Sequence, residues 1–142
     1  MAIRSITRFE DLESWQEARI LARRVYHLTK AAVFDQDREL RWQLRAAAVS
    51  PMSNIAEAYG RYSFEDKRRF FDIALGSCKE VQSQLYVALD QGYLTEDEFG
   101  GAYSQAETVA RLVTGSLANL EKQIAGRTTR GVQRRSGRKQ LI

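Results

Sequence analysis

The sequence predicts an all-α fold, an antiparallel up-down-up-down four-helix bundle with a kinked second helix. Apolar residues recur at spacings of three and four along four segments of the 142-residue chain, and this is the period of a helix. Short polar or glycine-containing connections separate the segments, and short connections place consecutive long helices antiparallel. No segment alternates apolar and polar residues for long enough to predict a strand.

The first two helices are expected at about residues 11–33 and 38–59. An apolar stripe that starts at Trp15 predicts the first helix, and the polar segment FDQDRE follows it as a linker. A second stripe then continues up to Gly60. We expect this glycine to end the second helix in the left-handed conformation that glycine adopts readily.

The third and fourth helices are expected at about residues 64–91 and 96–124. Each begins after a hydroxyl residue that has an acid three positions later, which is the pattern of a capping box, at Ser63 with Asp66 and at Thr95 with Glu98. Gly92 is expected to end the third helix.

Pro51 is the only proline in the chain, and it falls within the second helix. Proline lacks the N–H group that would bond the carbonyl of Ala47, and its ring clashes with that carbonyl, at a cost of about 3 kcal/mol unless the helix bends. We therefore expect a kink between Ala47 and Pro51.

Polar residues beyond this proline share one side of the second helix. Asn54, Glu57 and Arg61 follow one another at spacings of three and four, and Ser77 and Glu80 are similarly spaced on the third helix. A tight turn joins the two helices, so we expect the two groups to face each other as a structural polar network at a subunit interface. A catalytic site built on Glu57 and Glu80 is the alternative.

The residue types argue against an enzyme. A di-iron bundle needs a Glu from each of two helices and Glu-x-x-His from each of two others, whereas His27 is the only histidine and Arg24 stands three residues before it. Cys78 lies on an apolar stripe, and neither a glycine-rich phosphate loop nor a zinc-binding spacing occurs. We expect no catalytic residue, cofactor or metal.

The positive charge is concentrated at the C-terminus. The chain has 22 Lys+Arg and 18 Asp+Glu, for a net charge of +4, yet residues 126–142 hold six of the basic residues and no acid. We assign residues 1–125 to the bundle and residues 126–142 to a basic tail. Because the tail contains three glycines, we expect a flexible, non-helical arm.

Such an arm suits binding to RNA or DNA phosphates without sequence specificity. The candidate residues, from the tail and from the second helix, are Arg127, Arg130, Arg134, Arg135, Arg138, Lys139, Arg41 and Arg45. A solvated terminus with no partner is the alternative.

Large aromatic residues outside the apolar stripes predict a contact surface. They are Trp42, Tyr62, Phe64, Phe70, Tyr86, Tyr93, Phe99 and Tyr103. One such residue is usually half-buried at a helix end, but so many together favour a subunit interface or a protein-interaction scaffold.

The chain is expected to be cytoplasmic. Cys78 is alone, so it forms no intrachain disulfide. The N-terminus lacks the apolar core of a signal peptide, and no apolar run has the length of a membrane span.

A set of motifs spreads over residues 9–124. FEDL stands at residues 9–12, SNIAE at 53–57 and IALGSCKE at 73–80. In this combination the chain resembles the four-helix-bundle proteins encoded within 23S rRNA intervening sequences of bacteria and, more distantly, the accessory bundle proteins of diversity-generating retroelements. The resemblance implies a cytoplasmic homopentameric ring with no established enzymatic role, and the distant similarity implies nucleic acid and a reverse transcriptase as partners.

The chain departs from the pattern of that family at three places. Its proline stands at position 51 rather than 52, Ala46 replaces a favoured arginine, and Ala58 replaces a favoured glycine. The missing basic residue at position 46 weakens the case for a phosphate-binding surface on this helix. The basic tail lies outside the family pattern, so the resemblance implies nothing about it.

Overall fold

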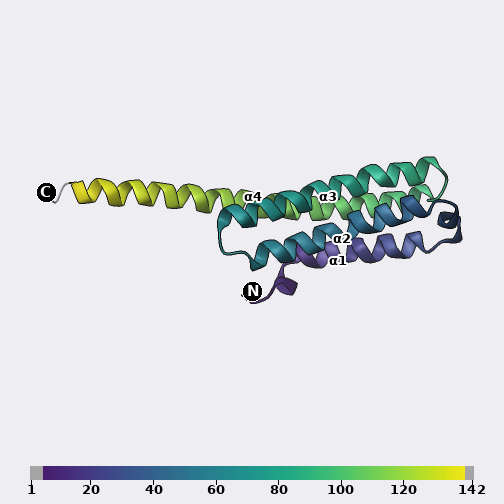
Figure 1. The fold of residues 1–142 in the computed structure, drawn as a ribbon, viewed down its shortest axis with the longest axis horizontal. Helices are drawn as coiled ribbons and strands as arrows, with labels where there is room; N and C mark the ends of the chain where they lie inside the picture. Colours follow the sequence, from purple (N-terminus) through teal and green to yellow (C-terminus); the bar gives the residue numbers. More distant parts are fainter. Residues whose placement is uncertain (1–4, 140–142) are drawn as a thin grey trace.

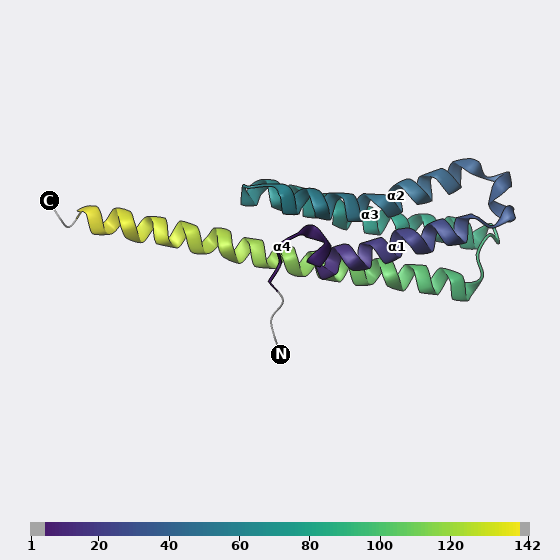
Figure 2. The same cartoon turned by 90° about the horizontal axis from the view of Figure 1, so that it is seen from below.

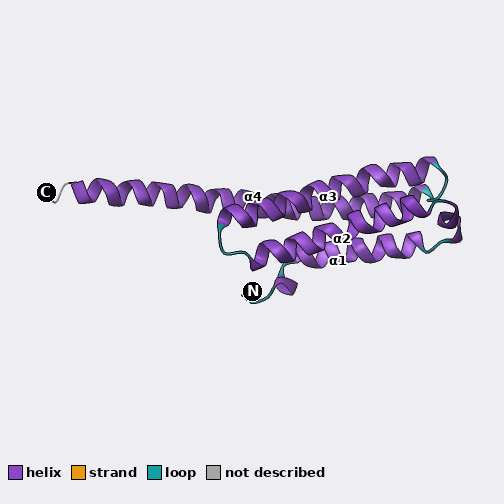
Figure 3. Ribbon diagram, in the orientation of Figure 1, coloured by secondary structure: helices purple, strands orange, loops and turns teal. Residues whose placement is uncertain are grey.

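The fold consists of helices throughout the part of the chain described by the computed structural model, which covers the backbone of residues 5–139 and the side chains of residues 5–132 (Figure 3). In chain order the elements are η1 (Phe9–Asp11), α1 (Glu13–Thr29), η2 (Ala32–Gln36), α2 (Arg38–Gly60), α3 (Phe64–Asp90) and α4 (Glu96–Lys139), where η marks a 3-10 helix. No strand occurs in this part of the chain, which confirms the predicted all-α class.

The four α-helices pack as an antiparallel bundle. Each helix contacts the next along the chain, and α1 also contacts α4, so that the four helices form a closed square (Figures 1 and 2). The core lies along the shared axis of the square, and its largest fully buried side chains include Leu21, Val25, Phe34, Leu44, Ile55, Val81, Leu85, Val109 and Val113. The predicted up-down-up-down four-helix bundle is confirmed.

The predicted start signals of α3 and α4 are confirmed. Ser63 Oγ accepts a hydrogen bond from the backbone N–H of Asp66 at 3.1 Å. Thr95 Oγ1 accepts from the N–H of Glu98 at 3.1 Å, and Glu98 Oε1 accepts from the N–H of Thr95 at 2.9 Å, which is a complete capping box. Gly92, just after α3, has a φ of +75°, as predicted for a residue that ends a helix.

The predicted end of the first helix was wrong. Helix α1 ends at Thr29, and the chain then forms η2, which buries Phe34 completely. The Phe34 ring packs at 5.2 Å from the ring of Tyr93. Burial of this large side chain is favourable by about 1.5–3 kcal/mol, and the polar residues around it gave no sign of that burial.

Gly60 does not adopt the predicted left-handed conformation. It is the last residue of α2, and Gly92 is the only glycine with positive φ among the described residues. Two of the last carbonyls of α2 find another partner, because Lys67 Nζ donates to the carbonyls of Ala58 and Tyr59 at 3.2 and 3.1 Å. A side chain from α3 therefore supplies the hydrogen bonds to the last carbonyls of α2 that a left-handed cap would otherwise supply.

The predicted end of the fourth helix at residue 124 and the predicted non-helical tail were also wrong. Helix α4 continues to Lys139 and projects beyond the ends of α2 and α3 (Figures 1 and 2). Each glycine costs about 1 kcal/mol relative to alanine, but the helix is already nucleated and no proline interrupts it. Thr128 and Thr129 also donate their hydroxyls to backbone carbonyls one turn earlier.

Pro51 is buried inside α2, and the helix continues through it. The expected kink stays a prediction. Within the described residues, no helix is both long enough and apolar enough to cross a membrane.

Candidate nucleic-acid interface

The charged residues at the end of α4 are all basic. After Glu121 the sequence has seven basic residues and no acid, and we call residues 122–139 the α4 extension. Positions 127, 130, 134 and 138 follow at spacings of three and four, which places them on one side of the helix. Arg127 and Arg130 are exposed to solvent.

The remaining candidates of the tail are described only in part. Arg134, Arg135, Arg138 and Lys139 belong to α4 by their backbone, and their side chains lie outside the described residues. Their backbone is helical, whereas a flexible arm was expected. A helix holds successive charged residues at fixed separations along its axis.

An aromatic side chain from α3 joins this basic segment. The guanidinium carbon of Arg127 lies 4.2 Å from the centroid of the Phe64 ring. The two residues, together with Lys122, Gly126 and Arg130, line a cleft of about 370 Å³. Residues 126–142 contain no aromatic residue. The spacing of residues in the sequence does not predict the contact with Phe64, because the two segments meet only in the folded bundle.

Arg41 and Arg45 do not form a free cationic surface, because contacts within the bundle hold both side chains. Arg41 Nε donates to the carbonyl of Thr29 at 2.8 Å, and Arg41 Nη2 pairs with Asp35 at 2.6 Å. Arg45 Nε donates to Thr29 Oγ1 at 2.8 Å, and its guanidinium covers the Tyr26 ring at 4.6 Å. Both arginines thus join α2 to the end of α1, and Arg41 also joins it to the segment that follows α1.

Two residues of the predicted polar network, Asn54 and Ser77, are connected through Ser50. Asn54 Nδ2 donates to Ser50 Oγ at 3.0 Å, and Ser50 Oγ lies 2.6 Å from Ser77 Oγ. The Ser77 hydroxyl donates its only proton to the carbonyl of Ile73 at 3.0 Å, so Ser50 is the donor to Ser77. Ser50, which the sequence analysis did not include, links the second and third helices.

The other members of the predicted network lie apart from this chain of hydrogen bonds. Glu57 and Arg61 form an ion pair at 2.5 Å on the surface of α2, and Arg61 also covers the ring of Phe70. Glu80 accepts a hydrogen bond from Gln84 at 3.3 Å on exposed α3. Both carboxylates are exposed to solvent and lie outside the hydrogen-bonded chain of Asn54, Ser50 and Ser77.

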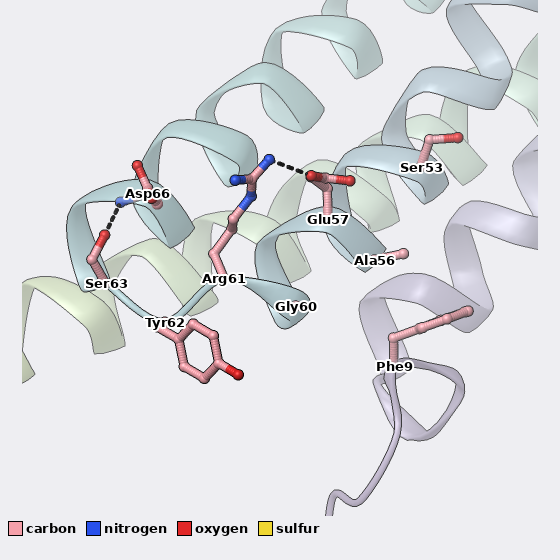
Figure 4. A pocket seen from close by; sticks show the side chains of 9 residues that line it. All are labelled: Phe9, Ser53, Ala56, Glu57, Gly60, Arg61, Tyr62, Ser63 and Asp66. Carbon is pink, nitrogen blue, oxygen red and sulfur yellow. Dashed lines mark hydrogen bonds and ion pairs between the residues drawn. The ribbon is translucent and has the colours of Figure 1, made fainter.

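A hollow of about 690 Å³ lies beside the Glu57 and Arg61 pair (Figure 4). Its walls come from η1, from the end of α2 and from the start of α3, where Ser63 caps the helix and Tyr62 is exposed. The charges in this hollow are mixed, because Glu57 and Asp66 accompany Arg61. Such a lining does not select an anion or a cation.

One stripe on the outward side of α2 is uncharged from Trp42 to Gly60. It presents six residues at spacings of four and three, Trp42, Ala46, Val49, Ser53, Ala56 and Gly60, and we call this the α2 stripe. All but half-buried Ala56 are exposed, and Trp42 is exposed to 72%. The spacing is that of the contact positions of a coiled coil.

Most of the other aromatics noted in the sequence pack within the chain. Tyr86, Phe99 and Tyr103 form a cluster with ring centroids 4.8–5.9 Å apart. Tyr93 packs against Phe34 and donates its hydroxyl to Asp37 at 3.2 Å. Trp42 and Tyr62 stay largely exposed.

The titratable side chains show no grouping suited to metal binding. Within the described residues, no three His, Cys, Asp or Glu side chains come together in a way that could hold a metal ion. Burial raises the pKa of the Cys78 thiol to about 12, so the thiol stays protonated at neutral pH. His27 is exposed on α1.

Comparison with known proteins places the bundle in a family. The family model of the 23S rRNA-intervening sequence protein matches residues 10–115. A crystal structure of a protein of unknown function from the S23 ribosomal protein family of Bacteroides thetaiotaomicron is similar, with a TM-score of 0.69 and 19% sequence identity over 74% of this chain and 95% of that chain. No curated protein matches. The chain therefore belongs to the 23S rRNA-intervening sequence protein family.

Proposed function

We propose that this protein is a cytoplasmic, non-enzymatic homo-oligomer that binds nucleic acid without sequence specificity through its α4 extension. One observation carries the proposal: the α4 extension, which has seven basic residues and no acid, projects beyond the bundle. A helix that stands away from the bundle brings its cations to a phosphate backbone without a clash between bundle and nucleic acid.

The expected binding is electrostatic. Cations that neutralise phosphates release condensed counterions, and the logarithm of the affinity then falls with the logarithm of salt concentration, with a slope of about −0.9 per phosphate neutralised on duplex DNA. Phosphate contacts carry no sequence information. The bundle contributes little net charge, because residues 1–125 contain 16 basic and 18 acidic residues.

We propose that the oligomer is a pentamer, as the family resemblance implies, and that the α2 stripe is part of its subunit interface. The exposed apolar side chains of this stripe, those of Trp42, Ala46 and Val49, cost free energy while they stay in water, and contact with a second copy of the chain removes them from it. Five copies would also gather five α4 extensions, so that weak individual contacts add up to a higher overall affinity.

The nucleic-acid proposal is tested by removing charge while keeping the helix. Arg130→Gln/Arg134→Gln/Arg138→Gln retains good helix formers, and its affinity for a labelled RNA and a labelled DNA duplex is measured by fluorescence anisotropy across a salt series. We expect weaker binding and a slope reduced by about 0.9 for each arginine that contacted a phosphate. A matched control, Arg23→Gln/Arg38→Gln/Arg111→Gln, removes the same charge from the bundle.

Two outcomes would contradict the proposal. One is equal affinity for the α4 variant and the unsubstituted protein. The other is an equal loss for the α4 variant and the bundle control, since this would make overall charge rather than the α4 extension responsible.

The oligomer proposal is tested by light scattering after size-exclusion chromatography. Ala46→Glu/Val49→Glu places two charges on the α2 stripe, and we expect it to lower the number of copies in the assembly. Ser104→Glu, at an exposed position of α4, is the control. An unchanged mass for the Ala46→Glu/Val49→Glu variant would exclude the stripe from the interface.

A protein-interaction scaffold is the second candidate function, for example as an accessory subunit of a reverse transcriptase. The exposure of Trp42 and Tyr62 favours it, because exposed aromatics are enriched at protein interfaces. This function predicts a stoichiometric complex that survives moderate salt, whereas nucleic-acid binding weakens steeply with salt.

A further inference from the structure

The cleft at the base of the α4 extension combines an aromatic ring with several cations. It is lined by Phe64 from the first turn of α3 and by Lys122, Gln123, Gly126, Arg127 and Arg130 from α4. Its volume of about 370 Å³ lies within the range of about 300–1,000 Å³ that is typical of ligand sites. Three of the lining residues are cationic and none is acidic.

We propose that this cleft is a site for one unpaired base of a single-stranded nucleic acid, with the base stacked on Phe64 and the adjoining phosphates bound by Lys122 and Arg130. The proposal deepens the proposed function and depends on it. It adds a preference for single strands over duplexes, which phosphate contacts alone do not provide.

The ring of Phe64 is already used as a stacking surface. Arg127 covers it with its guanidinium at 4.2 Å from the ring centroid. A base has a larger flat surface than a guanidinium, and its stacking on an aromatic side chain is the stronger interaction at an exposed site. A base can therefore replace Arg127 on the ring, and the released guanidinium can then pair with a phosphate.

The surroundings of the ring leave room for this exchange. Gly126 has no side chain, and no atom outside its own helix and its chain neighbours lies within 4 Å of the place where a Cβ would be. Lys122 and Arg130 are exposed, so their side chains can follow a strand, and Arg127 can do so once a base has replaced it on the ring. The nearby carboxylate of Glu121 lies 3.8 Å from Arg68 on α3, and this pairing reduces its repulsion of a phosphate.

The same geometry disfavours a duplex. In a double helix the flat faces of the bases are stacked on one another, so that a protein side chain reaches only the phosphates and the groove edges. An unpaired base exposes its face, and every base has one, so the site is tolerant of sequence. We therefore expect Phe64 to contribute to binding of RNA and DNA single strands and to contribute little with a duplex.

The test compares Phe64→Leu with the unsubstituted full-length protein. Leucine keeps an apolar side chain against the core but removes the aromatic face. Affinities for oligo(U), oligo(dT) and a DNA duplex of equal length are measured by fluorescence anisotropy. We expect Phe64→Leu to weaken single-strand binding about tenfold and duplex binding less than twofold. The single strand that loses more affinity identifies RNA or DNA as the preferred ligand.

Two control variants accompany this comparison. Phe64→Tyr keeps the ring and should bind single strands as the unsubstituted protein does. Tyr26→Leu removes the ring under Arg45, another arginine-aromatic pair of the bundle, and should leave affinity unchanged. Circular dichroism is recorded for each variant, so that a loss of helix is not mistaken for a loss of stacking.

A spectroscopic measurement detects the stacking itself. Phe64→Trp places an indole in the cleft, and we expect oligo(dT) to quench its fluorescence, while an abasic strand of equal length binds with little quenching. The proposal is overturned if Phe64→Leu binds single strands normally, or if it loses single-strand and duplex affinity equally.

These outcomes are distinguishable from failure of the proposed function. If Arg130→Gln/Arg134→Gln/Arg138→Gln loses affinity and Phe64→Leu does not, the α4 extension binds nucleic acid and the base site is wrong. If neither variant loses affinity, both proposals are wrong.

Discussion

Ser50 Oγ on α2 lies 2.6 Å from Ser77 Oγ on α3, and this contact is one step in a chain of hydrogen bonds from Asn54 to the carbonyl of Ile73. Ser77 is buried. The hydroxyls of Ser50 and Ser77 both have hydrogen-bond partners, as buried polar groups require. The interaction fixes the position of α2 along α3, because a shift by one residue would separate the two hydroxyls.

Ser77→Ala should destabilise the bundle. It leaves the Ser50 hydroxyl without its acceptor, and loss of such a bond typically lowers the free energy of unfolding by about 1 kcal/mol. The measurement is urea unfolding followed by circular dichroism. Ser104→Ala, at an exposed position of α4, is the control for the higher helix propensity of alanine. Equal stability of the two variants would show that the Ser50 contact contributes nothing.

Glu107 should make the bundle sensitive to acid. Gln82 Nε2 donates to Glu107 Oε2 at 2.7 Å, and Lys79 Nζ lies 3.3 Å from the same oxygen. These contacts, first that of Gln82, lower the pKa of Glu107 below its ordinary value of 4.5. The stability contributed by the ionised carboxylate is therefore present above pH 4.5 and is lost as the pH falls through the lowered pKa of the folded state.

Glu107→Gln should remove that part of the acid sensitivity. The measurement is the urea midpoint at neutral pH and below pH 4, for the variant and for the unsubstituted protein. Glu121→Gln is the control, because Glu121 and Arg68 form a long, exposed ion pair, and such pairs contribute little. The assignment is wrong if Glu107→Gln and Glu121→Gln depend on pH in the same way.

Cys78 should resist thiol reagents in the folded protein. Its side chain is fully buried, and burial raises the pKa of the thiol to about 12. Since the thiolate is the reactive form, labelling at pH 7–8 should be slow and should become rapid in denaturant. Ser104→Cys on α4 provides an exposed thiol for comparison. Rapid labelling of Cys78 without denaturant would reveal local opening of the α3 segment.

Gly131→Ala should stabilise the α4 extension. Gly131 is helical, and no atom outside its own helix and its chain neighbours lies within 4 Å of a Cβ added there, so alanine should gain about 0.5–1 kcal/mol of local helix stability. Amide hydrogen exchange of residues 126–132 should slow accordingly. Gly92→Ala is the opposite case, because the φ of +75° at Gly92 strains any side chain. Unchanged exchange in Gly131→Ala would contradict a helical extension.

The sequence determined the elements whose causes are local. The starts of α3 and α4 were predicted correctly because a capping box involves residues only three positions apart, as at Thr95 and Glu98. The four core faces followed from helical spacing. The end at Gly92 followed from the conformational freedom of glycine. Each of these signals is complete within a few residues of the chain.

Local signals failed where distant residues compete with them. Phe34 lies in a polar segment, yet it is buried in the core. Helix α1 ends at Thr29, and the chain forms η2 around Phe34. Lys67 from α3 bonds the last carbonyls of α2, and Gly60 therefore does not need the left-handed conformation. The glycines of the tail weaken a helix without ending one, because propagation of an existing helix is far easier than its nucleation.

The candidate site shows the same division. The sequence by itself determined the all-α class, the bundle, the family resemblance and the cluster of cations after Glu121, since all of these depend on residue type and spacing. Only the tertiary structure placed Phe64 under Arg127 and turned Arg41 and Arg45 toward Thr29. The physical reason is that helical spacing specifies which side of a helix a residue occupies, whereas the packing of four helices decides which other side chains it meets.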